Sequence, residues 1–316
     1  MRVFVTGASG FIGKRLLREL LRRGDRVVAL TRRRANLREA SSDTGGSGDG
    51  RLTVVEGDPG RAGPWQQALA GCDAVVTLAG EPIVGERWTE EFKRRVRDSR
   101  VEGMRRLGEA LAACPEAERP KVLVGASAVG IYGSRGDEVL DEDASPGHDF
   151  VAELCADWEA QARTAATPHG VRVTLLRIGV VLGLGGGMMA KVLPAFRAFV
   201  GGPLGDGKQW LPWVHIDDVV GAILWALDTP ASASRGSLNL AAPQPVRMRE
   251  FADTLGAVLH RPALLPVPRF AVKLLLGEGA KVALTSQRVL PKRLQELGYT
   301  FRHPELRAAL TDLVQE

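Results

Sequence analysis

Residues Val3–Leu20, which read VFVTGASGFIGKRLLREL, place a short apolar run, a glycine-rich turn and an amphipathic helix pattern in immediate succession. Glycine stands at positions 7, 10 and 13. In a strand–turn–helix unit, the first glycine permits a tight turn, the second lets the backbone approach a pyrophosphate, and the third lets the helix pack against the strand. The sequence therefore predicts a dinucleotide site in which the phosphates lie near Gly7, Ser9, Gly10, Phe11, Ile12 and Gly13.

The rest of the chain alternates strand and helix patterns. Apolar runs rich in Val, Leu and Ile recur at residues 2–6, 26–31, 52–56, 74–78, 121–126 and 171–178. Helical stripes between them are typical of a doubly wound parallel sheet, so we expect an α/β fold of the Rossmann type. The strand rhythm then weakens, and helix patterns follow at 188–198, 247–258, 283–297 and 304–315.

This change of rhythm predicts two domains. We expect an NADP-binding Rossmann domain over residues 1–178, completed by 214–240. A smaller, mostly helical module for substrate binding would occupy 179–213 and 241–316. Its glycine loop at 183–187 would offer backbone N–H groups to a substrate anion.

The composition is that of an ordinary globular protein, with 45% hydrophobic and 25% charged residues. The net charge is +5, but the arginines are spread along helix patterns, which argues against nucleic-acid binding. Three cysteines without a C-x-x-C pair favour a reducing compartment and no metal site. With neither a secretion signal nor an apolar run of roughly 18 residues, we expect a cytoplasmic monomer or homodimer that binds a small molecule and no membrane.

The end of the second apolar run indicates which dinucleotide is bound. It reads RVVALT and continues as Arg32-Arg33-Arg34, where an NAD site usually has an acidic residue for the ribose 2′-hydroxyl. A guanidinium suits a 2′-phosphate, so we predict NADP(H), with Thr31 and Arg32 in the site and Arg33 as second choice. The alternative is three solvated arginines. Asp58 could meet the adenine edge, although an Asp-Pro turn explains it equally well.

Four further motifs follow in order: TLAG at Thr77–Gly80, SAVGIYG at Ser127–Gly133, LRIGVVLG at Leu176–Gly183 and WVHIDD at Trp213–Asp218. With the N-terminal T-G-x-x-G-x-x-G pattern, they make the chain resemble the extended short-chain dehydrogenase/reductase superfamily. The segments LAGEPI, GGPLGDGKQW and SQRVLPKRLQELGYTF resemble its atypical branch, the nucleoside-diphosphate-sugar epimerase-like proteins with their own C-terminal module. The resemblance covers nearly the whole chain.

The resemblance also implies positions for the rest of the cofactor site. The adenosine ribose and phosphates would lie against Leu78, Ala79 and Gly80, and the nicotinamide beside Gly179 and Val180. The family's N-V-x-G-T motif is RVEG here, so Arg100 replaces the asparagine and would reach the cofactor phosphates. The alternative is an Arg100 that only pairs with an acidic neighbour. His215 would brace the loop beneath the substrate domain.

The catalytic pair departs from the family pattern. Typical members carry Tyr-x-x-x-Lys on the helix after the SAVGIYG-type strand, but this helix reads HDFVAELCADWEA here. Depending on loop register, the two positions hold Phe150 and Leu154, Val151 and Cys155, or Glu153 and Asp157. A second departure is Leu211, four residues before His215, where relatives that act on nucleotide sugars often carry an arginine.

We name three candidates for proton donation or substrate hydrogen bonding: Tyr132, Ser127 and Glu153. Tyr132 has no nearby lysine, so it should donate hydrogen bonds better than it abstracts protons. The alternative for Glu153 is a polar helix face. Trp210, Arg288 and Lys292 are candidate substrate contacts.

Two functions remain open. The first is an NADP(H)-dependent oxidoreductase or epimerase-like enzyme that acts on a small molecule. The second is a non-catalytic NADP(H)-binding sensor or partner-binding protein, which the missing Tyr-Lys pair favours.

Overall fold

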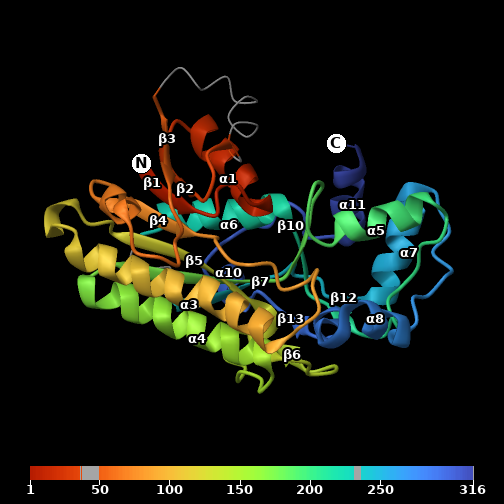
Figure 1. Cartoon of the computed structure of the whole chain (residues 1–316). Coiled ribbons are helices and arrows are strands. Elements are labelled where there is room, and N and C mark those ends of the chain that lie inside the picture. The colour runs from red at the N-terminus through yellow and green to blue at the C-terminus, as the bar shows by residue number, and fades with distance from the viewer. Residues whose placement is uncertain (36, 38–49, 231–235, 316) are drawn as a thin grey trace.

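The computed structural model describes residues 1–35, 37, 50–230 and 236–315. Seven parallel strands form the central sheet in the order β3-β2-β1-β4-β5-β7-β11 (Figure 1). They are β1 (Arg2–Thr6), β2 (Arg26–Thr31), β3 (Leu52–Glu56), β4 (Ala74–Thr77), β5 (Val122–Ala128), β7 (Arg172–Ile178) and β11 (Gly236–Leu240). The strand order reverses between β1 and β4, and in open α/β sheets ligands bind at this point, beyond the carboxyl ends of the strands.

Helices cover both faces of the sheet. One face packs against α1 (Phe11–Arg22) and α6 (Ile216–Asp228), and the other against α3 (Glu90–Ala113) and α4 (Phe150–Ala166) (Figure 1). Successive strand residues point to opposite faces, so Val3 and Val5 join the first core and Phe4 the second. Burial on both faces explains why the inner strands read as continuous apolar runs, whereas the edge strand β3 is only partly buried.

The C-terminal part lies to one side of the sheet (Figure 1). A third core joins α5 (Met189–Arg197), α7 (Met248–Leu259) and α11 (Leu306–Gln315). In the chain, α8 (Arg269–Leu276) follows α7. Short strand pairs link this part to the sheet: β8 (Val180–Leu182) with β10 (Trp213–His215), β9 (Trp210–Leu211) with β12 (Val246–Arg247), and β6 (Val139–Leu140) with β13 (Arg288–Val289).

The predicted fold class is confirmed, but the continuous helix expected at 283–297 is wrong. That segment instead holds the end of α9 (Ala280–Ala283), the strand β13 and the short helix α10 (Lys292–Glu296). Pro291 precedes α10 as its N-cap, and a proline there cannot continue a helix from the preceding residues because it lacks an N–H. Since α6 and β11 complete the sheet region, we keep the division at 178, with 214–240 returning to the first domain, as a proposal. In the part of the chain that the structure describes, no helix is long and apolar enough to cross a membrane.

Candidate cofactor and substrate site

The turn after β1 is pressed against the loop after β4. Gly7 has φ of +74°, and a Cβ there would lie 2.7 Å from both the amide nitrogen of Ala79 and the carbonyl carbon of Leu78. A Cβ on Gly13 would lie only 2.0 Å from the carbonyl oxygen of Gly7. Both positions therefore require glycine, for the two packing reasons that the sequence motif implies.

The N-terminus of α1 is open to an anion. Gly10 is its N-cap, no side chain caps the helix, and its first turn contains no acidic residue. The first N–H groups of a helix lack partners within the helix and carry the positive end of its dipole. This arrangement fits a pyrophosphate over Gly10, Phe11 and Ile12, with Ser9 in the same turn.

The Phe11 side chain packs against the glycine loop that follows β8. A Cβ on Gly186 would lie 2.5 Å from the Phe11 ring, and a Cβ on Gly183 would lie 2.8 Å from it. The glycines of 183–187 thus make room for the first side chain of α1. This packing argues against our expectation that the loop binds a substrate anion, and it instead attaches the C-terminal part to the cofactor turn.

The part of the site expected to bind the 2′-phosphate lies at the end of β2. The Thr31 hydroxyl donates to the Arg33 carbonyl oxygen at 3.1 Å and so shapes the turn. The Arg32 side chain is 73% exposed, and its Nη1 lies 4.0 Å from a carboxylate oxygen of Glu81, just beyond the 78–80 loop. Arg32 therefore extends over the place where the adenosine ribose is expected. Asp58 Oδ1 accepts from the Gly60 N–H at 2.9 Å, as the turn interpretation requires.

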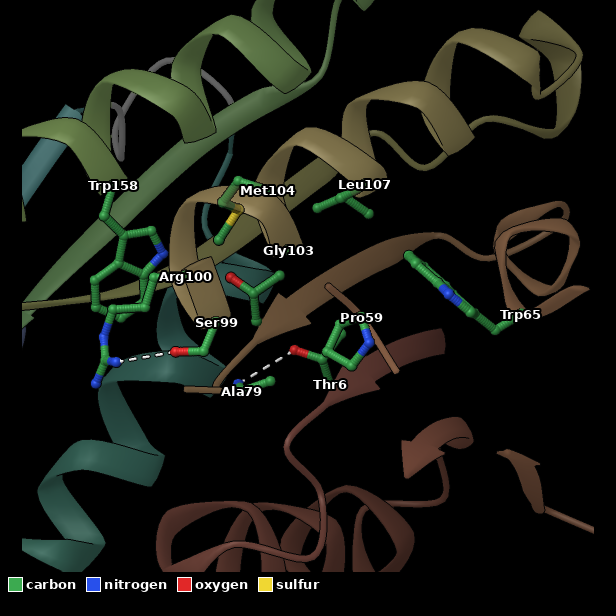
Figure 2. Close-up of a pocket in the computed structure, with 11 residues that line it drawn as sticks. Thr6, Pro59, Trp65, Ala79, Ser99, Arg100, Gly103, Met104, Leu107 and Trp158 are labelled. Carbon is green, nitrogen blue, oxygen red and sulfur yellow. Dashed lines mark hydrogen bonds between the residues drawn. The ribbon is translucent and has the colours of Figure 1, made fainter. Parts of the chain in front are cut away.

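Hydrogen bonds hold the 78–80 loop against β1. The Leu78 N–H donates to the Thr6 carbonyl oxygen at 3.1 Å. The Ala79 N–H donates to the Thr6 hydroxyl at 3.3 Å (Figure 2). A Cβ on Gly80 would lie 3.0 Å from Arg100 Cζ. The three residues that the resemblance assigns to the adenosine side thus form one loop directly beside the Gly7 turn.

Arg100 supports this loop from behind. Its Nη1 donates to the Glu81 carbonyl oxygen at 3.0 Å, and its guanidinium carbon lies 5.2 Å from the centroid of the Trp158 ring (Figure 2). Burial lowers the pKa of this guanidinium. It contacts backbone oxygens, the Ser99 hydroxyl and an aromatic ring rather than an acidic side chain. We therefore infer that Arg100 does not bind the cofactor phosphates itself and acts on them only by holding the loop.

A small cavity lies behind the same loop (Figure 2). Its volume is about 10 Å³, about the space of one water molecule. Its lining includes Thr77, whose buried hydroxyl has no hydrogen-bond partner among the described residues. A bridging water would satisfy that hydroxyl, whereas a dinucleotide would not fit, so we assign the cavity no binding role.

Tyr132 belongs to a buried hydrogen-bond network. Its side chain is fully buried. Its hydroxyl donates to Asn239 Oδ1 at 2.6 Å and accepts from Arg177 Nη1 at 2.9 Å. Burial raises the pKa of this hydroxyl, although Arg177 opposes the rise. Because both partners belong to the protein, the structure favours a positioning role for Tyr132 over proton donation to a substrate.

Ser127 enters the same network through Glu159. The Ser127 hydroxyl donates to Glu159 Oε1 at 2.8 Å, and Arg177 donates to the two carboxylate oxygens at 2.8 and 3.1 Å. The Ser237 hydroxyl and Arg163 Nη2 also donate to Glu159 Oε2, at 2.6 and 3.0 Å. Ser127 is 3% exposed, so the prediction that it contacts substrate also gives way to a structural role.

The helix α4 carries the positions where the family has its catalytic pair. A Cβ on Gly130, in the turn after β5, would lie 2.6 Å from Val151 Cγ1 and 3.9 Å from Cys155 Sγ. Of the three registers that the sequence allowed, Val151 and Cys155 thus face this turn. Burial raises the pKa of the Cys155 thiol to about 12.

Glu153 lies on the outer, exposed face of α4. One turn further along this face, Asp157 forms an ion pair with Arg97 at 2.5 Å. The polar-face alternative therefore describes Glu153 better than a donor role. Leu154 faces away from the turn and packs with Phe92.

The side expected to hold the nicotinamide lies where β7 ends. A Cβ on Gly179 would lie 2.1 Å from the Pro212 carbonyl oxygen, and the Val180 N–H donates to that oxygen at 2.7 Å. The WVHIDD segment is thereby fixed against Gly179 and Val180. His215 caps α6, since its Nδ1 accepts from the Asp217 N–H at 3.2 Å. Burial lowers the pKa of His215 to about 4, which suits the bracing role that the resemblance implies.

The same histidine lies near other potential metal ligands. Ligand atoms of His215, Asp217 and His303 lie within 4.8 Å of one another. Both carboxylate oxygens of Asp217 already accept from Arg15, at 2.8 and 3.0 Å. A bound cation would lie beside this guanidinium, so we assign no metal to the cluster.

Two of the three predicted substrate residues come together. The half-buried Trp210 ring has Arg247 Cζ at 4.5 Å and Arg288 Cζ at 4.7 Å from its centroid. Its indole N–H donates to Asp137 Oδ1 at 2.7 Å. Lys292 instead pairs with Asp141 at 3.1 Å. The sequence reasoning missed Arg247 and Asp137, which no motif marks.

The sequence reasoning also missed Glu159, Arg177 and Asn239. For Arg177 a signal was present, because a charged residue inside the apolar run TLLRIGVV requires a buried partner. Glu159 lies nine positions after Phe150 in a helix whose other face is polar, and its sequence context did not distinguish it from a surface residue.

Two segments of the chain match models of known protein families. Residues 3–241 match the model of the NAD dependent epimerase/dehydratase family. The chain belongs to this family. Residues 267–313 match a second model, a domain of unknown function (DUF1731), which corresponds to the C-terminal module that the resemblance implied.

Relatives in this family extend over the whole chain. An epimerase family protein SDR39U1 homolog from Arabidopsis thaliana, described as chloroplastic, is 42% identical over 100% of this chain and 87% of its own length. Human epimerase family protein SDR39U1 is 38% identical over 99% of this chain and 100% of its own. A crystal structure of human SDR39U1 isoform 2 with NADPH superposes with a TM-score of 0.86 at 35% identity and covers both chains completely.

The predicted family and its α/β fold are therefore confirmed. More distant members share the fold: the protein MoeE5, in a structure with UDP-glucose and NAD, superposes with a TM-score of 0.77 at 24% identity, over 100% of this chain and 98% of its own. This epimerase-family chain thus combines the family's nucleotide-binding architecture with a buried Ser127–Glu159–Arg177–Tyr132 network and without a tyrosine or lysine on the face of α4 turned toward Gly130.

Proposed function

We propose that this chain is an NADP(H)-dependent oxidoreductase or epimerase-like enzyme that acts on a small molecule. The observation that carries the proposal is the Gly7 turn, which is packed against Leu78 and Ala79 beside the uncapped start of α1. The NADPH in the human relative's structure supports the choice of cofactor. The exposed Arg32 at the end of β2, in place of an acidic residue, supports the same choice.

In this proposal, the chain's own residues bind and orient the cofactor. The first N–H groups of α1 hold the pyrophosphate, Arg32 pairs with the 2′-phosphate, and the 78–80 loop supports the adenosine ribose. Gly179 and Val180 form the wall beside the nicotinamide, held by Pro212. When bound, the nicotinamide supplies or accepts a hydride.

The buried network has a different task in this proposal. The hydroxyl groups of Ser127 and Tyr132 are already engaged as hydrogen-bond donors, to Glu159 and Asn239 respectively. We therefore propose that they fix the 129–133 turn relative to β7 and β11, and that the proton for a reduced carbonyl comes from water or from the substrate itself. Glu153, on the outer face of α4, has no part in this step.

The substrate is not proposed to be a nucleotide sugar. The relatives with such ligands are similar in fold only, and Leu211 stands where many of them carry an arginine for the pyrophosphate. We propose instead a smaller substrate bound between the 129–133 turn and the Trp210 segment.

A non-catalytic NADP(H)-binding protein is the second candidate. It is favoured by one observation: Val151 and Cys155 occupy the face of α4 that is turned toward Gly130, and neither side chain can serve as the family's tyrosine or lysine. Both candidates require NADPH to bind.

A turnover assay separates the two. Purified protein would be loaded with NADPH and screened against aldehydes, ketones and 2-oxo acids for loss of nicotinamide absorbance. The enzyme proposal predicts loss with at least one carbonyl class. A Gly13→Ala variant, whose added Cβ would push α1 away from the Gly7 turn, serves as the negative control. Tight NADPH binding with no oxidation by any class would instead favour the sensor.

A further inference from the structure

Two arginine side chains, Arg247 and Arg288, lie against the Trp210 ring, and one carboxylate, that of Asp137, is bonded within this cluster. Asp137 Oδ1 accepts from Arg247 Nη2 at 2.9 Å as well as from the Trp210 indole N–H. Arg247 is therefore paired. Arg288, whose Cζ lies 4.7 Å from the indole centroid, has no hydrogen bond or ion pair from its guanidinium to any described residue, and its Nε is buried without a partner.

An unpaired, half-buried guanidinium is an unfavourable arrangement unless something else satisfies it. Taking a charged group out of water costs free energy that a hydrogen-bonded partner must offset. The guanidinium is a planar group with several N–H donors, and a carboxylate or a phosphate matches it with two oxygens. Contact with the face of the Trp210 ring holds such a group in place while N–H groups that the ring does not use can donate to a ligand.

The fold turns Arg288 away from the core. In the pair of β13 with β6, Val289 lies opposite Leu140 and both are buried, whereas Arg288 lies opposite Val139, which is 47% exposed. Successive residues of a strand point to opposite sides. The strand therefore buries Val289 and presents Arg288 on the solvent side, next to Trp210.

This place adjoins the expected reaction site. Gln287, the neighbour of Arg288, donates from Nε2 to the carbonyl oxygens of Val129 and Gly133 at 2.9 and 3.0 Å, and so ties β13 to the turn after β5. On the other side, Trp210 lies two residues before Pro212, whose carbonyl oxygen accepts from Val180. The strand that carries Arg288 is thus held to the 129–133 turn by Gln287, and the Trp210 ring beside Arg288 belongs to the segment that leads into the proposed nicotinamide wall.

We propose that Arg288 binds a carboxylate or phosphate group of the substrate, with Trp210 as the surface on which the guanidinium is held. The inference rests on the proposed function, because it places this anion beside the proposed cofactor. Asp137 and Arg247 are positioning residues: Asp137 is bonded to Arg247 and to the indole, and its charge also acts on Arg288. One carboxylate against two guanidinium groups leaves a net positive charge for the ligand. The enzyme is therefore a reductase or epimerase-like protein for a small acid or a small phosphate ester.

Anion binding to the NADPH-saturated protein tests the inference. Saturation fills the phosphate sites of the cofactor, so that added inorganic phosphate or acetate reports on other sites. The readout is the NMR signal of the Trp210 indole N–H, assigned from its absence in Trp210→Phe. We expect a saturable shift with at least one of the two anions, and the comparison between them tells which oxyanion the site prefers.

Arg288→Gln should weaken that binding at least about tenfold, because a charge-assisted bidentate pair is lost. Arg288→Lys should restore part of it. Arg249→Gln is the matched control, because Arg249 is an exposed arginine of the nearby helix α7 that pairs with Asp253, and its variant should bind the anions as the wild type does. NADPH titrations of each variant check that the fold is retained.

Two results would overturn the inference: no saturable shift of the Trp210 signal with either anion, or the same shift in Arg288→Gln as in the wild type. Failure of NADPH to bind to the wild type would refute the proposed function instead. NADPH binding without any anion response would refute only the role of Arg288.

Discussion

Replacement of Arg177 by methionine tests whether the buried network is structural. The guanidinium of Arg177 donates to Glu159 at 2.8 and 3.1 Å and to Tyr132 at 2.9 Å, and the Glu159 side chain is 3% exposed. Removing one partner of a buried ion pair leaves an uncompensated charge and costs about 3–5 kcal/mol. Arg163 remains 3.0 Å from Glu159, so we expect the lower end, about 3 kcal/mol.

Urea denaturation followed by circular dichroism measures this loss. The double variant Arg177→Met/Glu159→Leu is the control: it removes both charges, and it should recover much of the loss because no carboxylate is left buried without its partner. A single variant within about 1 kcal/mol of the wild type would refute the reasoning, since a loss that small is typical of exposed pairs.

Tyr132, Gly186 and His215 each offer a single substitution with a measurable outcome. Tyr132→Phe should lower the free energy of unfolding in urea by about 1–3 kcal/mol, because Asn239 and Arg177 lose a shared buried partner. The turnover of the folded variant should stay at the wild-type rate. A turnover reduced a hundredfold or more, roughly the effect of losing a general acid, would restore Tyr132 as the proton donor. Gly186→Ala should displace the Phe11 ring, which would lie 2.5 Å from the added Cβ, and should weaken NADPH binding at least about tenfold in a fluorescence titration. Unchanged affinity would show that the position of the Phe11 ring does not control the position of the first turn of α1. Burial and His303 lower the pKa of His215 from 6.5 to about 4, so between these pH values the unfolded chain binds a proton that the folded chain does not, and the free energy of unfolding should fall as the pH falls. Urea midpoints measured at several pH values should decline less in His215→Asn, which keeps an acceptor for the α6 cap. Equal declines in the wild type and the variant would contradict the assignment.

The sequence predicted the parts of this protein that depend on local backbone demands. Gly7 and Gly13 stand where a side chain would collide with backbone atoms, so their spacing between a strand pattern and a helix pattern identified the turn. The six apolar runs correspond to strands, and most of them are buried on both faces of the sheet, whereas β3 is an edge strand with Thr53 and Glu56 exposed. The failure at 283–297 has a local cause, since the residues are helix-compatible but Pro291 and the pairing of Arg288 with Val139 interrupt the helix.

The roles of Tyr132 and Ser127 depended on distant residues that the sequence could not place. The partners of Tyr132 are Asn239 on β11 and Arg177 on β7, and neither lies near it in sequence. The motif SAVGIYG therefore has the residues of a donor site, while tertiary contacts determine that both hydroxyls are buried. The cluster of Trp210 with Arg247 and Arg288 arises in the same way, from three segments that meet only in the fold.

The central claim is a site for NADP(H), and the dissociation constants of NADPH and NADH measured side by side test it most directly. The wild type should bind NADPH more tightly. Arg32→Glu should weaken NADPH at least about tenfold, through loss of a charge-assisted pair with the 2′-phosphate, and leave NADH nearly unchanged. Arg34→Glu, at an exposed arginine whose Nε lies 3.8 Å from Glu56, should change neither constant. Equal affinity of the wild type for the two dinucleotides, or an Arg32→Glu variant that binds NADPH like the wild type, would contradict the account.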